Sequence, residues 1–347
     1  MKRAFLKTVG FILMGSFIAG GLTWVSNHFD PVHCMGKRRI KQMLRKADTI
    51  QAIAVGHSHN RSLEFREMGL DGYHLWMGGG DVFETHYLLR VVVPLLPNLK
   101  VVFMPITPHD FIHDNGASES RHAIRRAHYA TMPTVRSFRP IHGDIKNLVK
   151  GKLSAIVRSD HWKGVVKSII SQLRGEVQAP YNPLCEVDED GYEGTRITLV
   201  MDRKSLLERI NKLEHHIRLA KEFYRNHPEI TENVFATLVS IVKYLQEKNV
   251  RLIFYTPPYS DIYIEMLHKD DLGIVNLAKH YMQQLREDFG IEYYDFFEDP
   301  VFTGNYNYFF DVDHLNLSGA RLFSQNLKRI CESTKPYGLT STYANGR

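Results

Sequence analysis

The stretch IAVGHSHNRS, residues 53–62, places polar side chains directly after an apolar segment. Ile53, Ala54 and Val55 are apolar and two of them are β-branched, so the segment has the character of a buried strand that Gly56 ends. The polar residues that follow are His57, Ser58, His59, Asn60 and Arg61. A turn of this composition can hold a nucleophile, hold a metal ion, or simply end a strand.

Strand and helix patterns alternate along the chain around and after this turn. Strands are predicted at residues 50–55, 99–106, 251–258 and 291–297, with a candidate short strand at 73–77. Helices are predicted at 81–96, 201–224, 232–249 and 274–289, and residues 311–330 have the pattern of a polar turn followed by a helix. The alternation predicts one α/β domain over residues 48–335 with a parallel sheet, and such sheets bind ligands at the carboxyl ends of their strands.

Residues 111–200 interrupt this alternation. They are rich in His and Arg, are broken by Pro and Gly, and show no clean period, which predicts an insertion or cap of short helices. Its basic residues around 121–128 are expected to form a solvated face, and the alternative is contact with an anionic glycan or lipid headgroup. Residues 336–347 are predicted to be a flexible tail.

The N-terminal segment has the pattern of a membrane anchor. Residues 9–25, VGFILMGSFIAGGLTWV, carry no charge and follow Lys2, Arg3 and Lys7. As a helix they reach about 25 Å, and the flanking residues extend this to the thickness of a hydrocarbon core. We therefore predict an uncleaved single-pass anchor over residues 1–28, since the small-residue motif of a cleaved signal peptide is missing. The leading basic residues place the bulk of the chain on the periplasmic or extracellular face.

Residues 29–47 are predicted to be a basic juxtamembrane linker. Its six basic residues are expected on one face of an amphipathic helix near the lipid headgroups, although basic residues after a span also weigh against the predicted orientation. These residues are Lys37, Arg38, Arg39, Lys41, Arg45 and Lys46. The net charge of +6 over 347 residues is otherwise spread out, so we expect no nucleic-acid partner.

A serine nucleophile is the first interpretation of the polar turn. Ser58 follows Gly56 at a strand end, and a serine needs a neighbouring base. Asp311 and His314 lie three residues apart, a spacing at which the carboxylate can orient the imidazole toward the serine. Backbone N–H groups of the glycine run 78–80, at a predicted helix N-terminus, can stabilise an oxyanion.

A metal site is the second interpretation. His57 and His59 form a His-x-His pair after a strand, where both side chains point to one face. The residues that could complete such a site are Asp311, Asp313, His314, His109 and Asp110. Taken singly, each of the two histidines is more simply a residue that lines a polar cleft, and Asp313 is expected to be a solvated turn residue.

Four motifs together resemble those of the SGNH/GDSL hydrolases. They are Gly56-His57-Ser58-His59, the Gly78-Gly79 pair, Thr256-Pro257-Pro258, and Asp311-x-x-His314-Leu-Asn-x-x-Gly319-Ala320. The chain is most similar to a membrane-anchored subset that includes the D-alanine-transfer proteins of teichoic-acid synthesis and the alginate O-acetylation proteins. The resemblance covers roughly residues 48–110 and 232–330, and it implies a three-layer sandwich around a parallel sheet.

The resemblance implies Ser58 as nucleophile, His314 as base and Asp311 as the acid that orients it. The Ser58 amide and Gly79 would form the oxyanion hole. Two features depart from the family pattern: His57 stands where an Asp usually precedes the serine, and the Gly-x-Asn-Asp block has no match. Residues considered in its place for oxyanion or substrate contacts are Thr107, His109 and His59.

The sequence thus predicts an acyl esterase or O-acyltransferase that acts on an envelope polysaccharide or a lipid-linked glycan. Its expected partners are the bacterial membrane, the acyl acceptor and a membrane-bound acyltransferase, and no cofactor is expected. One alternative is a non-catalytic envelope assembly or glycan-binding factor on the same fold. A second alternative is a metal-dependent hydrolase that uses His57 and His59.

Overall fold

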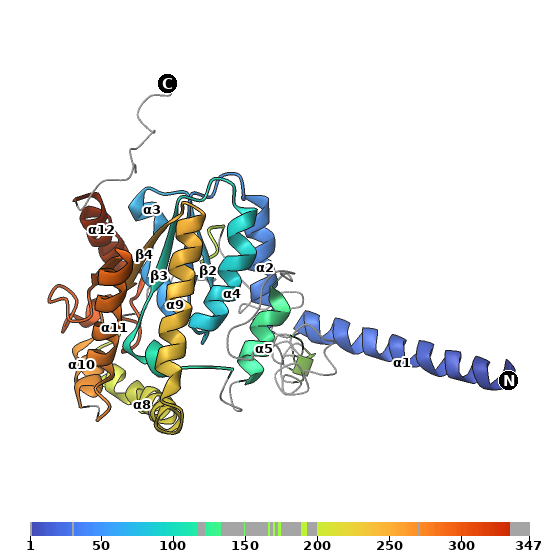
Figure 1. Cartoon of the computed structure of the whole chain (residues 1–347). Coiled ribbons are helices and arrows are strands. Elements are labelled where there is room, and N and C mark those ends of the chain that lie inside the picture. Colours follow the sequence, from blue (N-terminus) through green and yellow to red (C-terminus); the bar gives the residue numbers. More distant parts are fainter. Residues whose placement is uncertain are drawn as a thin grey trace.

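A parallel β-sheet lies at the centre of the molecule in the computed structural model (Figure 1). The structure describes residues 2–29, 31–116, 122–132, 149, 166, 169–170, 173–174, 189–192, 200–269 and 271–333. Within these residues five strands pair in the order β2-β1-β3-β4-β5. The strands are β1 (Ala52–Gly56), β2 (Gly72–Trp76), β3 (Val101–Pro105), β4 (Arg251–Thr256) and β5 (Glu292–Asp295). All four pairings are parallel, which confirms the predicted α/β class.

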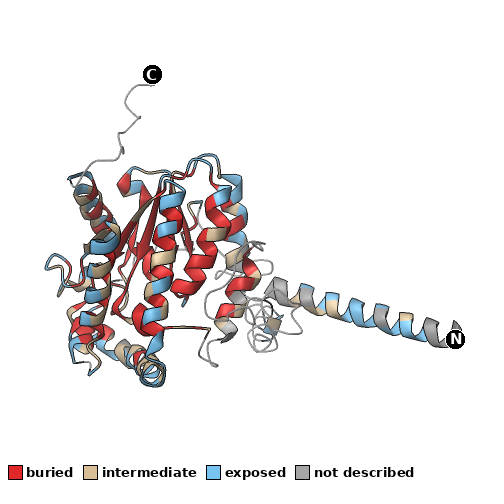
Figure 2. Ribbon diagram, viewed as in Figure 1, coloured by how far each residue is buried: buried red, intermediate tan, exposed pale blue. Residues whose placement is uncertain are grey.

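Helices cover both faces of the sheet. One face packs against α2 (Pro31–Arg45), α4 (Val82–Val92), α9 (Glu229–Glu247) and α11 (Ile274–Phe289). The other face packs against α3 (Phe65–Met68) and α12 (Leu317–Ser333). Alternate residues of a strand supply the two layers, as period two requires: Ile53 belongs to the first core and Ala54 to the second. Buried residues therefore follow the sheet and the inner helix faces (Figure 2), an arrangement compatible with a three-layer sandwich.

The remaining described elements are mostly helical. They include α5 (His122–Thr131), α8 (Arg203–Asn226), α10 (Asp261–His268) and the 3₁₀ turns η1 (Ser58–Ser62), η2 (Val93–Leu95), η3 (Pro108–Ile112) and η8 (Tyr306–Tyr308). The predicted strands and long helices are confirmed with small shifts in their ends, whereas α3 and α10 were not predicted because they are shorter than a periodic pattern can reveal. Most of the predicted insertion 111–200 and the tail 336–347 lie outside the described residues.

Helix α1 (Lys2–Phe29) extends away from the rest of the molecule (Figure 1). Its large apolar side chains are exposed, including Phe11, Phe17 and Trp24. Searched over the described residues alone, the chain contains no helix that is both long and apolar enough to cross a bilayer.

Helix α2 packs on the sheet domain, which corrects the predicted position of one basic residue. Ile40 and Met43 belong to the first core, so the apolar face of α2 contacts protein. Arg39 is only 4% exposed, donates to the carbonyl oxygens of Trp76 and Gly191, and lies 4.2 Å from the centre of the Trp76 ring. Arg38, Lys41 and Arg45 are exposed, as predicted for the basic face of this helix. Of these four basic residues, Arg39 is the one that is buried against the sheet domain.

A buried ion network fixes the start of α4, where the glycine run ends. Asp81 caps α4 in a reciprocal capping box with Glu84. The guanidinium of Arg125 on α5 pairs with Asp81 and with Asp114, the latter at 2.8 Å. His128 lies 3.0 Å from Glu84, so α5 provides a partner for each carboxylate of the capping box.

Replacing Arg125 with Met should lower the free energy of unfolding by about 3–5 kcal/mol, because the buried carboxylate of Asp81 loses its counter-charge. Urea denaturation followed by circular dichroism measures this loss. Arg126→Met, one residue away and only half-buried, is the matched control and should cost less than about 1 kcal/mol. Equal losses in the two variants would contradict a stabilising role for the network.

Candidate active site

Ser58 lies at the carboxyl end of β1, a strand with neighbours on both sides. Gly56 ends β1 with φ of 121°, a conformation that side-chain-bearing residues rarely adopt. His57 then caps η1, its Nδ1 accepting from the backbone N–H of His59, and Ser58 begins that turn. The abrupt change from strand to turn presents the Ser58 hydroxyl at the edge of the sheet.

The structure brings Ser58, His314 and Asp311 together. His314 Nε2 lies 2.8 Å from Ser58 Oγ, although the two residues are 256 positions apart in the sequence. On the other side of the ring, Nδ1 lies 3.0 and 3.1 Å from the two carboxylate oxygens of Asp311. Asp311 also accepts from the backbone N–H groups of Asp313 and His314, so the turn itself holds the carboxylate in place. This is the arrangement of a serine, a base and an orienting acid.

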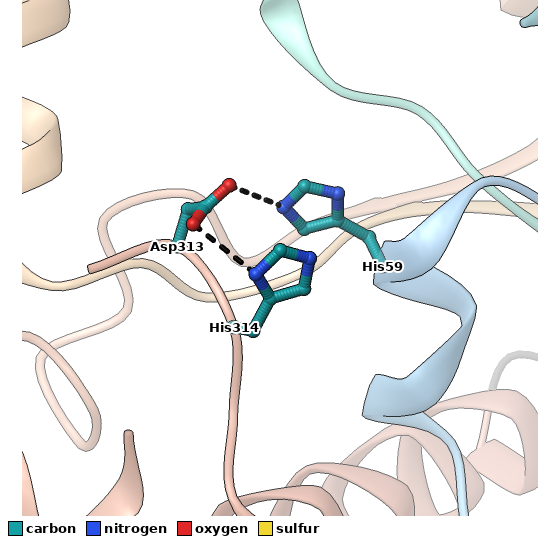
Figure 3. Close-up of side chains that lie close together, drawn as sticks. All are labelled: His59, Asp313 and His314. Carbon is teal, nitrogen blue, oxygen red and sulfur yellow. Dashed lines mark ion pairs between the residues drawn. The ribbon is translucent and has the colours of Figure 1, made fainter. Parts of the chain in front are cut away.

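Asp313 is a second carboxylate on the same imidazole, which corrects its prediction as a solvated turn residue. Its side chain is 11% exposed, and Oδ1 lies 3.1 Å from His314 Nδ1. Its other oxygen lies 3.4 Å from His59 Nε2 (Figure 3), so Asp313 bridges two histidines. The sequence contained a signal for this, because Asp313 immediately precedes His314 in Asp-Val-Asp-His.

The two carboxylates change the proton affinities of this cluster. Burial opposes the positive charge on His314, but Asp311 and Asp313 outweigh it and raise the pKa of His314 to about 10. For Asp313, burial is likewise outweighed by His314, and its pKa falls well below the usual range. Burial, with the nearby His314, lowers the pKa of His59 to about 3, so His59 is neutral at pH 7.

His59 and His57 connect the imidazole of His314 with Asp110 on η3. The ring of His59 stacks on that of His314, with centres 4.4 Å apart, and its Nδ1 lies 3.0 Å from His57 Nδ1. His57 Nε2 lies 3.1 Å from Asp110 Oδ2. The His57 that replaces the expected Asp therefore pairs with an acid from η3.

Thr107 is hydrogen-bonded to the same acid, Asp110. Its backbone N–H and its hydroxyl both donate to Asp110 Oδ2, at 2.7 and 2.8 Å. Thr107 is fully buried and does not line the cleft beside Ser58, so its candidacy as a donor to substrate is not supported by its position. His109 does line the cleft, and its ring contacts the Thr107 hydroxyl.

A cleft of about 240 Å³ opens beside Ser58. Gly79 and Gly80 line it together with Ser58 and His314. Gly79 has φ of 67°, and its carbonyl oxygen accepts from Asn115 Nδ2 at 2.8 Å, which fixes the glycine turn. The predicted nucleophile, base and glycine run therefore border one space.

Part of the cluster also has the composition of a metal site. Ligand atoms of His59, Asp313 and His314 lie within 4.8 Å of one another. His57 is not a member of this group, so the predicted His57–His59 pair is replaced by His59 with two residues of the 311–314 turn. A ring nitrogen of His314 that bound a metal ion there would lose its contact either with Ser58 or with the two carboxylates.

Comparison of the chain with protein-family models and with curated proteins finds no match. The chemistry of the site is therefore inferred from its own geometry.

Asp313→Asn should lower the pKa of His314 by about 1 to 3, because one of the two charges that favour the imidazolium is removed. NMR titration of ¹³C-labelled histidine follows this pKa directly, with His314→Gln identifying the resonance. Asp288→Asn, an exposed acid on α11, should leave the titration unchanged. An unaltered midpoint in Asp313→Asn would show that Asp313 does not act on this imidazole.

Proposed function

We propose that this protein is a serine acyl esterase or O-acyltransferase of the SGNH type. The observation that carries the proposal is the 2.8 Å contact between Ser58 Oγ and His314 Nε2, with the Asp311 carboxylate on the opposite side of the ring. The strand order 2-1-3-4-5 and the position of Ser58 at a strand end agree with it, since open α/β sheets place their sites there.

The reaction begins when Ser58 Oγ attacks the carbonyl carbon of an ester and His314 Nε2 accepts the serine proton. Asp311 keeps the ring oriented and stabilises the imidazolium that forms. The N–H groups of Ser58 and Gly79 stabilise the oxyanion of the tetrahedral intermediate. His314 then protonates the departing alcohol, which leaves an acyl-serine. Water or a sugar hydroxyl, deprotonated by the same histidine, completes hydrolysis or transfer.

The two departures from the family pattern, His57 and the missing Gly-x-Asn-Asp block, do not alter the residues that carry out these steps. His57 pairs with Asp110 rather than with Ser58 or His314, so the missing Asp leaves the serine–histidine contact intact. The absent Asn block leaves the Ser58 and Gly79 amides as the proposed oxyanion donors, with His109 the remaining side-chain candidate in the cleft.

Location at an envelope membrane is part of the proposal. The charge-free segment 9–25, the basic residues before it and the exposed apolar side chains of α1 support an N-terminal anchor with the sheet domain outside the cytoplasm. An enzyme held there would meet an envelope polysaccharide or a lipid-linked glycan as acyl acceptor, with a membrane-bound acyltransferase as its partner.

A fluorophosphonate should modify wild-type protein once, and Ser58→Ala should abolish the adduct, because the probe reacts only with an activated serine. Intact-mass spectrometry of the full chain in detergent measures this. His314→Ala should slow labelling at least about 10³-fold, since the serine then has no base. Labelling of wild type should also accelerate as pH rises toward 10, as the neutral form of His314 accumulates.

Ser62→Ala is a matched control, because Ser62 lies in the same turn but donates to the His59 carbonyl. Its labelling should remain at the wild-type rate. Wild type that stays unlabelled, yet binds glycan, would favour the non-catalytic assembly factor. Ester cleavage that chelators abolish and zinc restores would instead favour the metal-dependent hydrolase.

Deletion of residues 1–28 should move the protein from the membrane fraction to the soluble fraction, because the apolar segment is removed. Fractionation and carbonate extraction of expressing cells measure this. A double substitution of Phe11 and Phe17 with Asp should act in the same direction at unchanged length. Full-length protein that is already soluble would contradict the anchor.

A further inference from the structure

Helix α8 supplies an apolar wall to the cleft beside Ser58. Leu213, Ile217 and Ala220 line the cleft, and their spacing of four and three residues places them on one face of the helix. Ile217 is 7% exposed and belongs to a core that also contains Ile112 and Tyr259. The wall is thus held by the protein interior.

The polar side chains that line the same cleft already have protein partners. His57 contacts Asp110, His109 contacts Thr107, and His113 Nε2 lies 3.0 Å from Asn115 Oδ1. The ring of His59 stacks on that of His314, and its Nδ1 lies 3.0 Å from His57 Nδ1. Each of these histidines is therefore occupied in positioning other residues.

The charged side chains that line the cleft are also paired with one another. Among the described residues that line it, there is no Lys, Arg or Glu, and the one carboxylate, Asp313, is shared between His59 and His314. An ionised group on the acyl chain would lose its hydration here without gaining a counter-charge, which is costly. An aliphatic chain has no such hydration to lose and would bury apolar surface against α8.

The volume of the cleft sets how much of such a chain the protein can cover, because the cleft is open to solvent on one side. Its volume of about 240 Å³ equals that of about eight water-sized groups. The ester carbonyl and the attacking oxygen occupy part of it, so about four to six carbons remain for the acyl group.

We infer that the acyl group is a neutral aliphatic chain, of which about four to six carbons bind against Leu213, Ile217 and Ala220 of α8. The inference rests on the proposed function, because it requires an acyl-serine at Ser58. It distinguishes this protein from an acetyl-transferring or aminoacyl-transferring enzyme, whose donor group is shorter or charged.

The first experiment measures kcat/KM of the full-length protein for p-nitrophenyl acetate, butyrate, hexanoate and decanoate. We expect a rise of about fourfold per methylene from acetate to hexanoate, which corresponds to about 0.8 kcal/mol, and no comparable rise from hexanoate to decanoate. The alanyl ester should react at least about tenfold more slowly than the butyrate, although the two acyl groups are similar in size. A maximum at acetate, or an equal rate for the alanyl ester, would overturn the inference.

Substitutions on α8 then test which residues set the length. Ala220→Phe should lower the hexanoate-to-acetate ratio of kcat/KM at least about tenfold, because the new ring occupies the part of the cleft where the longer acyl chain would bind. Leu213→Ala should shift the optimum toward longer chains, and it keeps the test available if Ala220→Phe does not fold. Leu219→Phe, at a neighbouring exposed position, is the control and should leave the ratio unchanged. If Ala220→Phe and Leu213→Ala both fold and leave the hexanoate-to-acetate ratio unchanged, α8 does not bind the acyl chain.

Failure of this inference and failure of the proposed function give different results. A chain-length preference for acetate together with fluorophosphonate labelling of Ser58 would reject the acyl pocket and retain the serine enzyme. No labelling and no ester turnover of any length would reject both.

Discussion

The contact of two carboxylates with one imidazole nitrogen is the interaction on which the site depends. Asp311 and Asp313 both lie about 3 Å from His314 Nδ1, and this fixes the opposite nitrogen, Nε2, toward Ser58. A ring free to rotate would present either nitrogen to the serine. The short turn before α12 therefore determines which atom serves as base, while β1 determines where the serine stands. Neither segment can form the site without the other.

The parallel sheet provides the frame in which these distant segments meet. The carboxyl ends of β1 and β3 are adjacent, so the turn after β1 and η3 after β3 can pair through His57 and Asp110. The glycine run follows β2, the other neighbour of β1, and the ion network around Asp81 and Arg125 holds its end. Loops have no core of their own, and here buried polar pairs supply the rigidity that apolar packing supplies to the sheet.

The sequence predicts the parts of this site that local chemistry determines. A β-branched run ending in Gly56 predicts β1, and the Asp311–His314 spacing predicts a pair, because each depends on neighbours within a few residues. The contact of Asp313 with His59 and the burial of Arg39 were not predicted, since a polar residue in a turn or basic helix is indistinguishable from a solvated one until its distant partners are known. The α8 wall is similar: its apolar face predicts burial, whereas its position beside Ser58 depends on packing against residues distant in the sequence, such as Ile112 and Tyr259.

The same carboxylate pair that orients His314 also favours its protonated form, in which it cannot accept the proton of Ser58. Because the two carboxylates raise the pKa of His314 well above 7, the imidazolium predominates at pH 7, and forming the neutral base carries a free-energy cost. The imidazolium formed during acyl transfer is stabilised by the same charges, so part of this cost returns in the transition state. His59, stacked on His314, must stay neutral, because a second positive ring 4.4 Å away would weaken that stabilisation. Asp313 meets both needs, since its carboxylate favours the charged form of His314 at 3.1 Å and lies 3.4 Å from Nε2 of His59.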